Sequence, residues 1–121
     1  MILSNQQNIT FFFEGIYFYI KNSTIKYIYG GKRMQITFET IDNALIIKLS
    51  GELDHHSSEM AREKIDEWYY SKLNKNIIFD LRELDFMDSS GIGLLMARYK
   101  MCSENGGKVL IVNDNPNIQR I

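Results

Sequence analysis

The sequence predicts an α/β fold in which a mixed, mostly parallel β-sheet is flanked by helices. Two features from Met34 onward predict it. Short strand-like runs alternate with longer segments whose apolar residues recur at helical spacing. The run at residues 77–81, Ile-Ile-Phe-Asp-Leu, is almost wholly apolar, as expected of a buried parallel strand. A chain of 121 residues has room for one such domain.

A hairpin is predicted to open the domain. Residues 35–40 alternate polar and apolar side chains, and residues 44–49 contain an apolar run. Asp42 and Asn43 between them are typical of a turn, so the two strands are expected to pair. The segment 51–54, Gly-Glu-Leu-Asp, is expected to end the second strand.

The first helix is predicted over residues 57–73, and Asp54, Ser57 or Ser58 can cap its start. Tyr70 is expected to pack against the domain or line the helix surface, together with the two aromatic residues before it. The predicted apolar stripe consists of Ala61, Ile65, Trp68 and Tyr69.

A second helix is predicted from about residue 90 to residue 105, after a loop over residues 83–88. The pair Gly106-Gly107 is expected to end the helix. A strand over residues 108–112 follows, and Pro116 is placed where another helix would begin. The predicted apolar stripe of the second helix consists of Leu94, Leu95, Tyr99 and Cys102, which places Cys102 in the core.

Residues 1–33 differ in composition from the rest of the chain. Most of them are Ile, Phe, Tyr, Asn or Lys, which A/T-rich codons encode, and basic residues outnumber acidic ones. The segment ends with Gly-Gly-Lys-Arg before Met34, and a ribosome-binding sequence can encode these four residues. We therefore expect residues 1–33 to be untranslated leader that has been read in frame, ahead of a domain over residues 34–121. The alternative is a genuine extension that forms a hairpin, with a turn near Asn22 and Ser23.

Composition and charge exclude several classes of protein. The formal net charge of −1 argues against a nucleic-acid binder that is held by phosphate contacts. The single cysteine excludes an internal disulfide and favours a reducing, cytoplasmic compartment. The apolar run at residues 9–20 is interrupted by Glu14 and Gly15, and a membrane span needs about 20 apolar residues, so none is expected.

The most informative segment is the predicted strand-to-helix turn at residues 86–93, Phe-Met-Asp-Ser-Ser-Gly-Ile-Gly. It places two hydroxyls at a helix start, where free N–H groups and partial positive charge favour a phosphate. The two glycines remove side-chain bulk, so that another protein can approach the backbone. A purely structural interpretation is equally open, with Asp88 and Ser89 as a cap and the glycines as close packing of helix on sheet.

Three other chemistries are weaker. Ser89, Asp54 and His55 or His56 could form a hydrolytic triad, but the Gly-x-Ser-x-Gly elbow is absent. The Asp-His-His run could ligate a metal, but no third ligand has suitable spacing. A dinucleotide fingerprint fails because Met96 stands where its last glycine would be. We therefore expect no cofactor and no catalytic activity.

Two motifs carry a resemblance to a known family, and they stand at the right separation from each other. Residues 34–121 resemble the STAS domain of the anti-sigma factor antagonist family, in particular its sporulation members that act on an anti-sigma F factor. The residues are Gly51-Glu52-Leu53-Asp54-His55-His56 and Phe86-Met87-Asp88-Ser89-Ser90-Gly91-Ile92-Gly93, with support from Arg98-Tyr99-Lys100 and Gly106-Gly107.

The resemblance implies a phosphorylation switch. In this family the first serine after the aspartate is phosphorylated, which corresponds to Ser89, with Ser90 as the less favoured acceptor. The implied partners are an anti-sigma factor that is also a serine kinase, and a serine phosphatase. The unphosphorylated antagonist binds the anti-sigma factor and frees the sigma factor, and a monomer is expected. The implied partner-binding residues are Asp54, His55, Asp88, Ser89, Ser90, Gly91, Ile92 and Gly93.

The chain departs from the family pattern at both ends. Residues 1–33 have no counterpart in it, and the family continues beyond residue 121 with further elements. The domain is therefore predicted to be C-terminally incomplete, with apolar surface exposed. The alternative function is a STAS interaction module of a stress-signalling scaffold or of a transporter regulator.

Overall fold

The computed structural model describes residues 2–4, 8–13, 16–21, 24–30, 33–71 and 75–119. Strands and helices alternate in its second half, as the sequence predicts. The elements of the described residues are β1 (Ile2–Ser4), β2 (Asn8–Phe13), β3 (Ile16–Lys21), β4 (Thr24–Gly30), β5 (Met34–Ile41), β6 (Ala44–Leu53), α1 (His55–Ser71), β7 (Asn76–Met87), α2 (Ser89–Glu104), β8 (Val109–Val112) and α3 (Pro116–Gln119).

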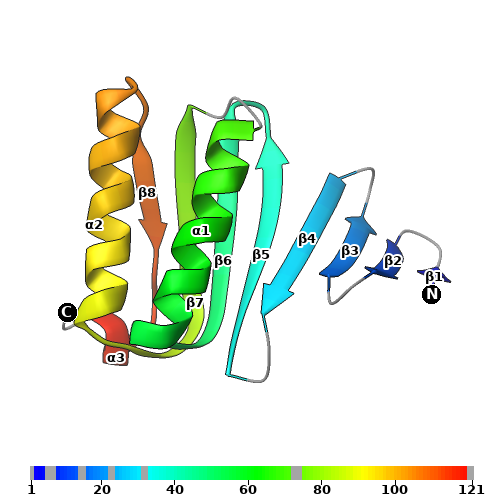
Figure 1. Cartoon of the computed structure of the whole chain (residues 1–121), viewed down its shortest axis with the longest axis horizontal. Coiled ribbons are helices and arrows are strands. Elements are labelled where there is room, and N and C mark those ends of the chain that lie inside the picture. The colour runs from blue at the N-terminus through cyan, green and yellow to red at the C-terminus, as the bar shows by residue number, and fades with distance from the viewer. Residues whose placement is uncertain are drawn as a thin grey trace.

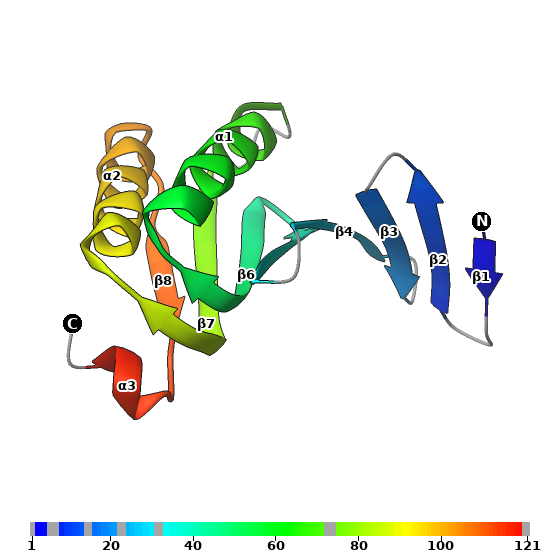
Figure 2. The same cartoon turned by 60° about the horizontal axis from the view of Figure 1, so that its bottom comes forward.

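The strands form one sheet in chain order, from β1 to β8 (Figure 1). Neighbours from β1 to β6 pair antiparallel, whereas β6, β7 and β8 pair parallel. Helices α1 and α2 cover the same face of the sheet over β5 to β8 (Figure 2). The mixed α/β architecture predicted for residues 34–121 is therefore confirmed.

The core lies between this face of the sheet and the two helices. Strand alternation turns Ile36 and Phe38 of β5 inward, where both are fully buried. Phe38 stacks on Trp68 of α1, with the ring centroids 5.0 Å apart and the planes 2° from parallel. The stripe predicted for the first helix is buried at all four positions, and Tyr70 is exposed.

The predicted loop over residues 83–88 is wrong, because β7 continues to Met87. Leu81, Leu84 and Met87 are buried although they are three residues apart, which is not the alternation of a regular strand. Two shifts in the β6–β7 register accommodate the odd spacing. The partner strand β6 likewise extends beyond residues 44–49, to Leu53, and so ends within the segment 51–54 as expected.

The stripe predicted for the second helix is wrong at Tyr99, which is 59% exposed. Arg98 is buried in its place. Its guanidinium turns toward α1 and makes two hydrogen bonds with Asp66, of 3.0 Å from Nε and 2.9 Å from Nη2. The ion pair satisfies the buried charge, which hydrophobic patterning alone does not reveal. Cys102 is fully buried, as predicted.

In the N-terminal segment, β3 and β4 pair antiparallel, and β4 pairs with β5. The turn expected near Asn22 and Ser23 lies outside the described residues. The predicted origin of residues 1–33 as untranslated leader concerns the gene and stays a prediction.

An apolar hollow of about 430 Å³ lies where α2, β7, β8 and α3 meet. Ile111 at its rim is 49% exposed and Met96 is 66% exposed. Exposed apolar surface was expected at this end of the domain. The residues that line the hollow are Leu81, Met87, Ile92, Leu95, Met96, Ile111, Asn113 and Ile118.

Candidate partner-binding and phosphorylation site

Two helix starts lie side by side at one edge of the sheet. Because β6 and β7 are parallel neighbours, the chain leaves both at the same edge and enters α1 and α2 there. The Asp88 N–H donates to the Leu53 carbonyl at 3.3 Å, which joins the two turns directly. The topology thus brings together the two motifs that the sequence singles out.

Asp54 caps α1, as the sequence allowed. The Ser57 N–H donates to Asp54 Oδ1 at 2.9 Å, and the Asp54 N–H donates to Ser57 Oγ at 2.9 Å. The hydrogen bonds from Ser57, the backbone one foremost, lower the pKa of the Asp54 carboxyl below its ordinary value. Asp54 therefore presents a fixed negative charge at neutral pH. The helix begins at His55, two residues before the predicted start.

Asp88 caps α2 in the same manner. Its Oδ1 accepts from the Ser90 N–H at 2.9 Å and from the Gly91 N–H at 3.3 Å. These bonds use first-turn donors that would otherwise meet an added anion. Asp88 is thus a structural cap that also sets the charge of the turn.

The two serines of the turn differ in their surroundings. Ser89 is exposed, and its side chain has no hydrogen-bond partner among the residues that the structure describes. Ser90 is half-buried, and its Oγ lies 3.3 Å from His55 Nδ1. Ser89 is consequently the hydroxyl that an incoming enzyme can reach without breaking a contact.

The two glycines of the turn have different roles. A Cβ at Gly91 would lie 2.4 Å from Met87 Cγ and 3.0 Å from Leu53 Cδ2, so Gly91 allows α2 to pack closely on the sheet. A Cβ at Gly93 would meet nothing within 4 Å. Close packing therefore explains Gly91, whereas Gly93 leaves open surface. Ile92 between them is half-buried and packs against the core.

The histidines do not assemble a hydrolytic site. His55 is exposed and contacts Ser90 rather than Ser89, and its Nε2 lies 3.9 Å from Glu59 Oε1. The Asp54 carboxylate is engaged by Ser57 and does not orient a histidine. Among the described residues, no group of three His, Cys, Asp or Glu side chains could hold a metal ion.

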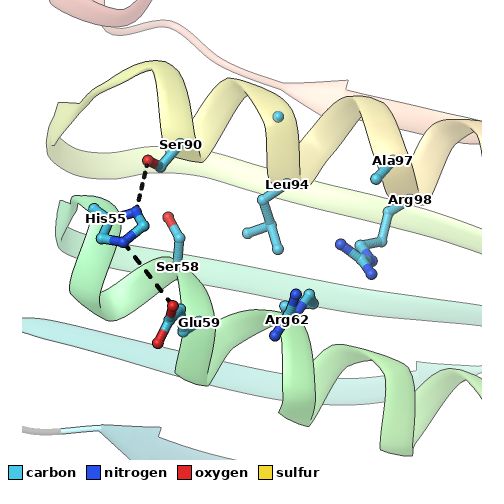
Figure 3. A pocket seen from close by; sticks show the side chains of 9 residues that line it. His55, Ser58, Glu59, Arg62, Ser90, Leu94, Ala97 and Arg98 are labelled. Atoms are coloured by element: carbon cyan, nitrogen blue, oxygen red, sulfur yellow. Dashed lines mark hydrogen bonds and ion pairs between the residues drawn. The ribbon is translucent and has the colours of Figure 1, made fainter.

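A groove between α1 and α2 continues from this turn, and the sequence interpretation did not include it. It has a volume of about 290 Å³. His55 and Ser90 lie at one end, and Arg62 and Arg98 lie further along, on facing helices (Figure 3). One sequence signal for it existed, because Arg98 falls at helical spacing between Leu94 and Cys102 on the apolar stripe.

A mixed sheet whose parallel strands lead into two adjacent capped helices defines an α/β domain of the STAS type. The model of the STAS domain family matches residues 35–121, and the chain belongs to that family. Its similarity to curated proteins then places it among the anti-sigma factor antagonists. It is 41% identical over 88 residues to the anti-sigma F factor antagonist of Paenibacillus polymyxa, which covers 73% of this chain and 75% of the relative.

Further relatives agree with this placement. The anti-sigma F factor antagonist of Lysinibacillus sphaericus is 36% identical over 71% of this chain and 70% of its own length. Among solved structures, the anti-sigma factor antagonist SpoIIAA in its unphosphorylated form superimposes with a TM-score of 0.64 at 32% identity, over 70% of this chain and 75% of that one. SpoIIAA in its phosphorylated form gives 0.61 at 32% identity, over 70% and 78%.

None of the helices in the described residues is both long and apolar enough to span a membrane.

Proposed function

We propose that the chain is an anti-anti-sigma factor that is regulated by phosphorylation of Ser89. The unphosphorylated form binds an anti-sigma factor, which is itself a serine kinase, and so releases the sigma factor. Phosphorylation ends this binding, and a serine phosphatase restores it. The chain acts as a binding protein and a kinase substrate, not as a catalyst. The observation that carries the proposal is the Ser89 hydroxyl at the start of α2, which is exposed and has no hydrogen-bond partner within the described structure.

The binding surface is proposed to surround Ser89 at the two helix starts. Asp54, His55 and Ser90 lie next to it, and Gly93 supplies open backbone on the first turns of α2. Gly91 and Ile92 lie on the side of α2 that packs on the core, so they hold this surface in position on the sheet. Asp88 holds the turn in place through its cap.

Electrostatic repulsion explains why phosphorylation should weaken binding to the anti-sigma factor. A phosphoserine adds nearly two negative charges at neutral pH. The Asp54 and Asp88 carboxylates already lie at this edge of the sheet, and the Asp88 side chain occupies first-turn donors that could stabilise a phosphate. A dianion at Ser89 would have to lose its hydration in a tight interface next to these two carboxylates, which is costly. Affinity for the anti-sigma factor is thereby lost while the fold is kept.

Intact-mass measurement after incubation with an anti-sigma factor kinase and ATP tests the proposal. We expect one phosphate on the parent chain and on Ser90→Ala, and none on Ser89→Ala. Because Ser90→Ala removes the neighbouring hydroxyl, it is the matched control for Ser89→Ala. Phosphate on Ser89→Ala would move the site to another residue, and no phosphate on the parent chain would contradict the proposal.

A further inference from the structure

The groove between α1 and α2 contains a buried hydroxyl that lacks a partner. Ser58 is 7% exposed, and its Oγ has no hydrogen-bond partner within the described part of the chain. Figure 3 shows this hydroxyl turned into the groove, beside His55 and Ser90. Buried polar side-chain atoms in proteins are nearly always hydrogen-bonded. The groove therefore offers a hydrogen bond to a polar group from outside the chain.

The charges further along the groove leave a positive excess. Arg62 and Arg98 face each other from α1 and α2 (Figure 3). Arg98 pairs with Asp66, at 2.9 Å between Nη2 and Oδ2, whereas Arg62 has no ion-pair partner among the described residues. These three groups together carry one unbalanced positive charge. Glu59 also lines the groove, at the other end beside His55, so the positive excess is confined to the end at Arg62. A monoanion such as a carboxylate balances the charge at Arg62, whereas a phosphate dianion would exceed it.

The size and lining of the groove also fit a short acidic side chain. Its volume of about 290 Å³ is at the lower limit for a small-molecule site and is too small for a nucleotide. Leu94 and Ala97 of α2 give it an apolar wall that methylene groups can contact. An Asp or Glu side chain has this combination of a short apolar stem and a charged end.

We propose that this groove receives an Asp or Glu side chain of the anti-sigma factor. The carboxylate of that side chain accepts a hydrogen bond from the Ser58 hydroxyl and forms an ion pair with Arg62. The proposal rests on the proposed function, because the groove continues from the Ser89 turn through His55 and Ser90. It also adds to the switch. A phosphate on Ser89 would repel the same carboxylate that the groove attracts.

The first experiment uses the full chain alone, with acetate as the probe for a carboxylate side chain and inorganic phosphate as the comparison. Amide chemical shifts in NMR spectra are followed during titration at constant ionic strength. We expect acetate to cause saturable shifts at Ser58, Arg62 and Gly93. The shifts should be lost in Ser58→Ala and Arg62→Gln and kept in two controls, Ser103→Ala and Lys108→Gln. An absence of saturable shifts, or tighter binding of phosphate than of acetate, would overturn the assignment to a carboxylate.

The second experiment measures the affinity for the anti-sigma factor kinase with the same variants. We expect Ser58→Ala and Arg62→Gln each to weaken binding roughly tenfold or more, since a hydrogen bond or ion pair with a charged group is lost. Arg62→Lys keeps the charge and should recover part of the affinity. Both controls should bind as the parent does, because Ser103 and Lys108 are exposed positions away from the groove.

Stability measurements separate a role of Ser58 in partner binding from a role in the stability of the fold. Because its hydroxyl has no partner among the described residues, Ser58→Ala should unfold at the same temperature as the parent or above it, even though it binds more weakly. A variant that binds weakly only because it is unfolded would fail this test and overturn the proposal.

If the parent binds the kinase and both groove variants bind equally well, the groove proposal is wrong and the proposed function stands. If the parent does not bind the kinase at all, the proposed function and the identity of the partner are both wrong.

Discussion

Two adjacent serines of the same turn have different chemical surroundings. Ser90 contacts His55 at 3.3 Å, whereas Ser89 is exposed and unpartnered in the described structure. The sequence alone places both at a helix start and does not separate them. Only the packing of α1 beside α2 shows which hydroxyl is engaged.

At the residue scale, the Asp54 cap predicts a pH dependence of stability. The carboxyl has a lowered pKa in the folded chain, because Ser57 hydrogen-bonds its charged form. Its stabilising contribution is therefore present above the unfolded-state pKa and is lost as the pH falls through the lower folded-state value. Asp54→Asn keeps an uncharged cap, so its unfolding free energy should approach that of the parent as the pH falls from about 7 to about 3. Denaturant unfolding at the two pH values measures this. A difference between the two chains that stays constant with pH would contradict it.

The buried Arg98 gives a second prediction at this scale. Asp66→Asn leaves the guanidinium with no carboxylate, so we expect a loss of about 1–3 kcal/mol in unfolding free energy, because Asp66 is partly exposed. Glu67→Gln is the matched control, since the Lys64–Glu67 pair is a surface contact of 3.7 Å and should contribute less than about 0.5 kcal/mol. Denaturant unfolding of both variants is the measurement. Equal losses would show that the Arg98 pair has no special role.

The sequence predicts a structural feature best when the residues that cause it are close together in the chain. The caps at Asp54 and Asp88 are local, because the acceptor and the donors lie within three residues, and the sequence names both among the possible caps. The burial of Arg98 and the isolation of Ser58 depend on a partner or a neighbour on the other helix. Helical spacing places Arg98 on the apolar stripe, but no spacing in the chain indicates which residue of the other helix it contacts.

At the element scale, the strands and helices from Met34 onward agree with the prediction in type and order, and their ends do not. The spacing of three between Leu81, Leu84 and Met87 hides the last part of β7 from a search for alternation. The register shifts that make this spacing compatible with a strand belong to its pairing with β6. The register between two strands that are far apart in the chain cannot be predicted from the residues of one of them.

The glycines of α2 give a matched pair of predictions at this scale. Gly91→Ala should destabilise the domain by about 1–3 kcal/mol, because the added methyl meets Met87 and Leu53. Gly93→Ala has open space around it and should stabilise α2 by up to about 1 kcal/mol through helix propensity. It should also weaken binding to the anti-sigma factor if the partner approaches there. Thermal unfolding and affinity of the two variants test this, and equal stability changes would contradict the assigned roles.

For the whole molecule, the parallel pairing of β6 and β7 places two sequence motifs, 35 residues apart at His55 and Ser90, in contact. The order of elements predicts that these motifs share one edge of the sheet. It does not predict the groove between the helices, since that depends on side-chain packing. Fold and site are therefore inferable from the order of elements, and the specificity of the site is not.

The N-terminal segment gives a prediction at this scale. We propose that residues 1–33 are leader and that translation begins at Met34. Peptide mapping of the protein from its own source should then find an N-terminal peptide that starts at Met34 or at the residue after it. A peptide from within residues 1–33 would show that the segment is translated.

Under the proposed function, one phosphate at Ser89 abolishes binding to the anti-sigma factor without unfolding the domain. The most direct test is the affinity of the anti-sigma factor for the same chain before and after phosphorylation, with circular dichroism recorded on both forms. We expect the phosphorylated form to bind at least about 100-fold more weakly, a free-energy difference of about 3 kcal/mol, with an unchanged spectrum. Equal affinity of the two forms, or a loss of affinity accompanied by loss of the helical signal, would contradict the account.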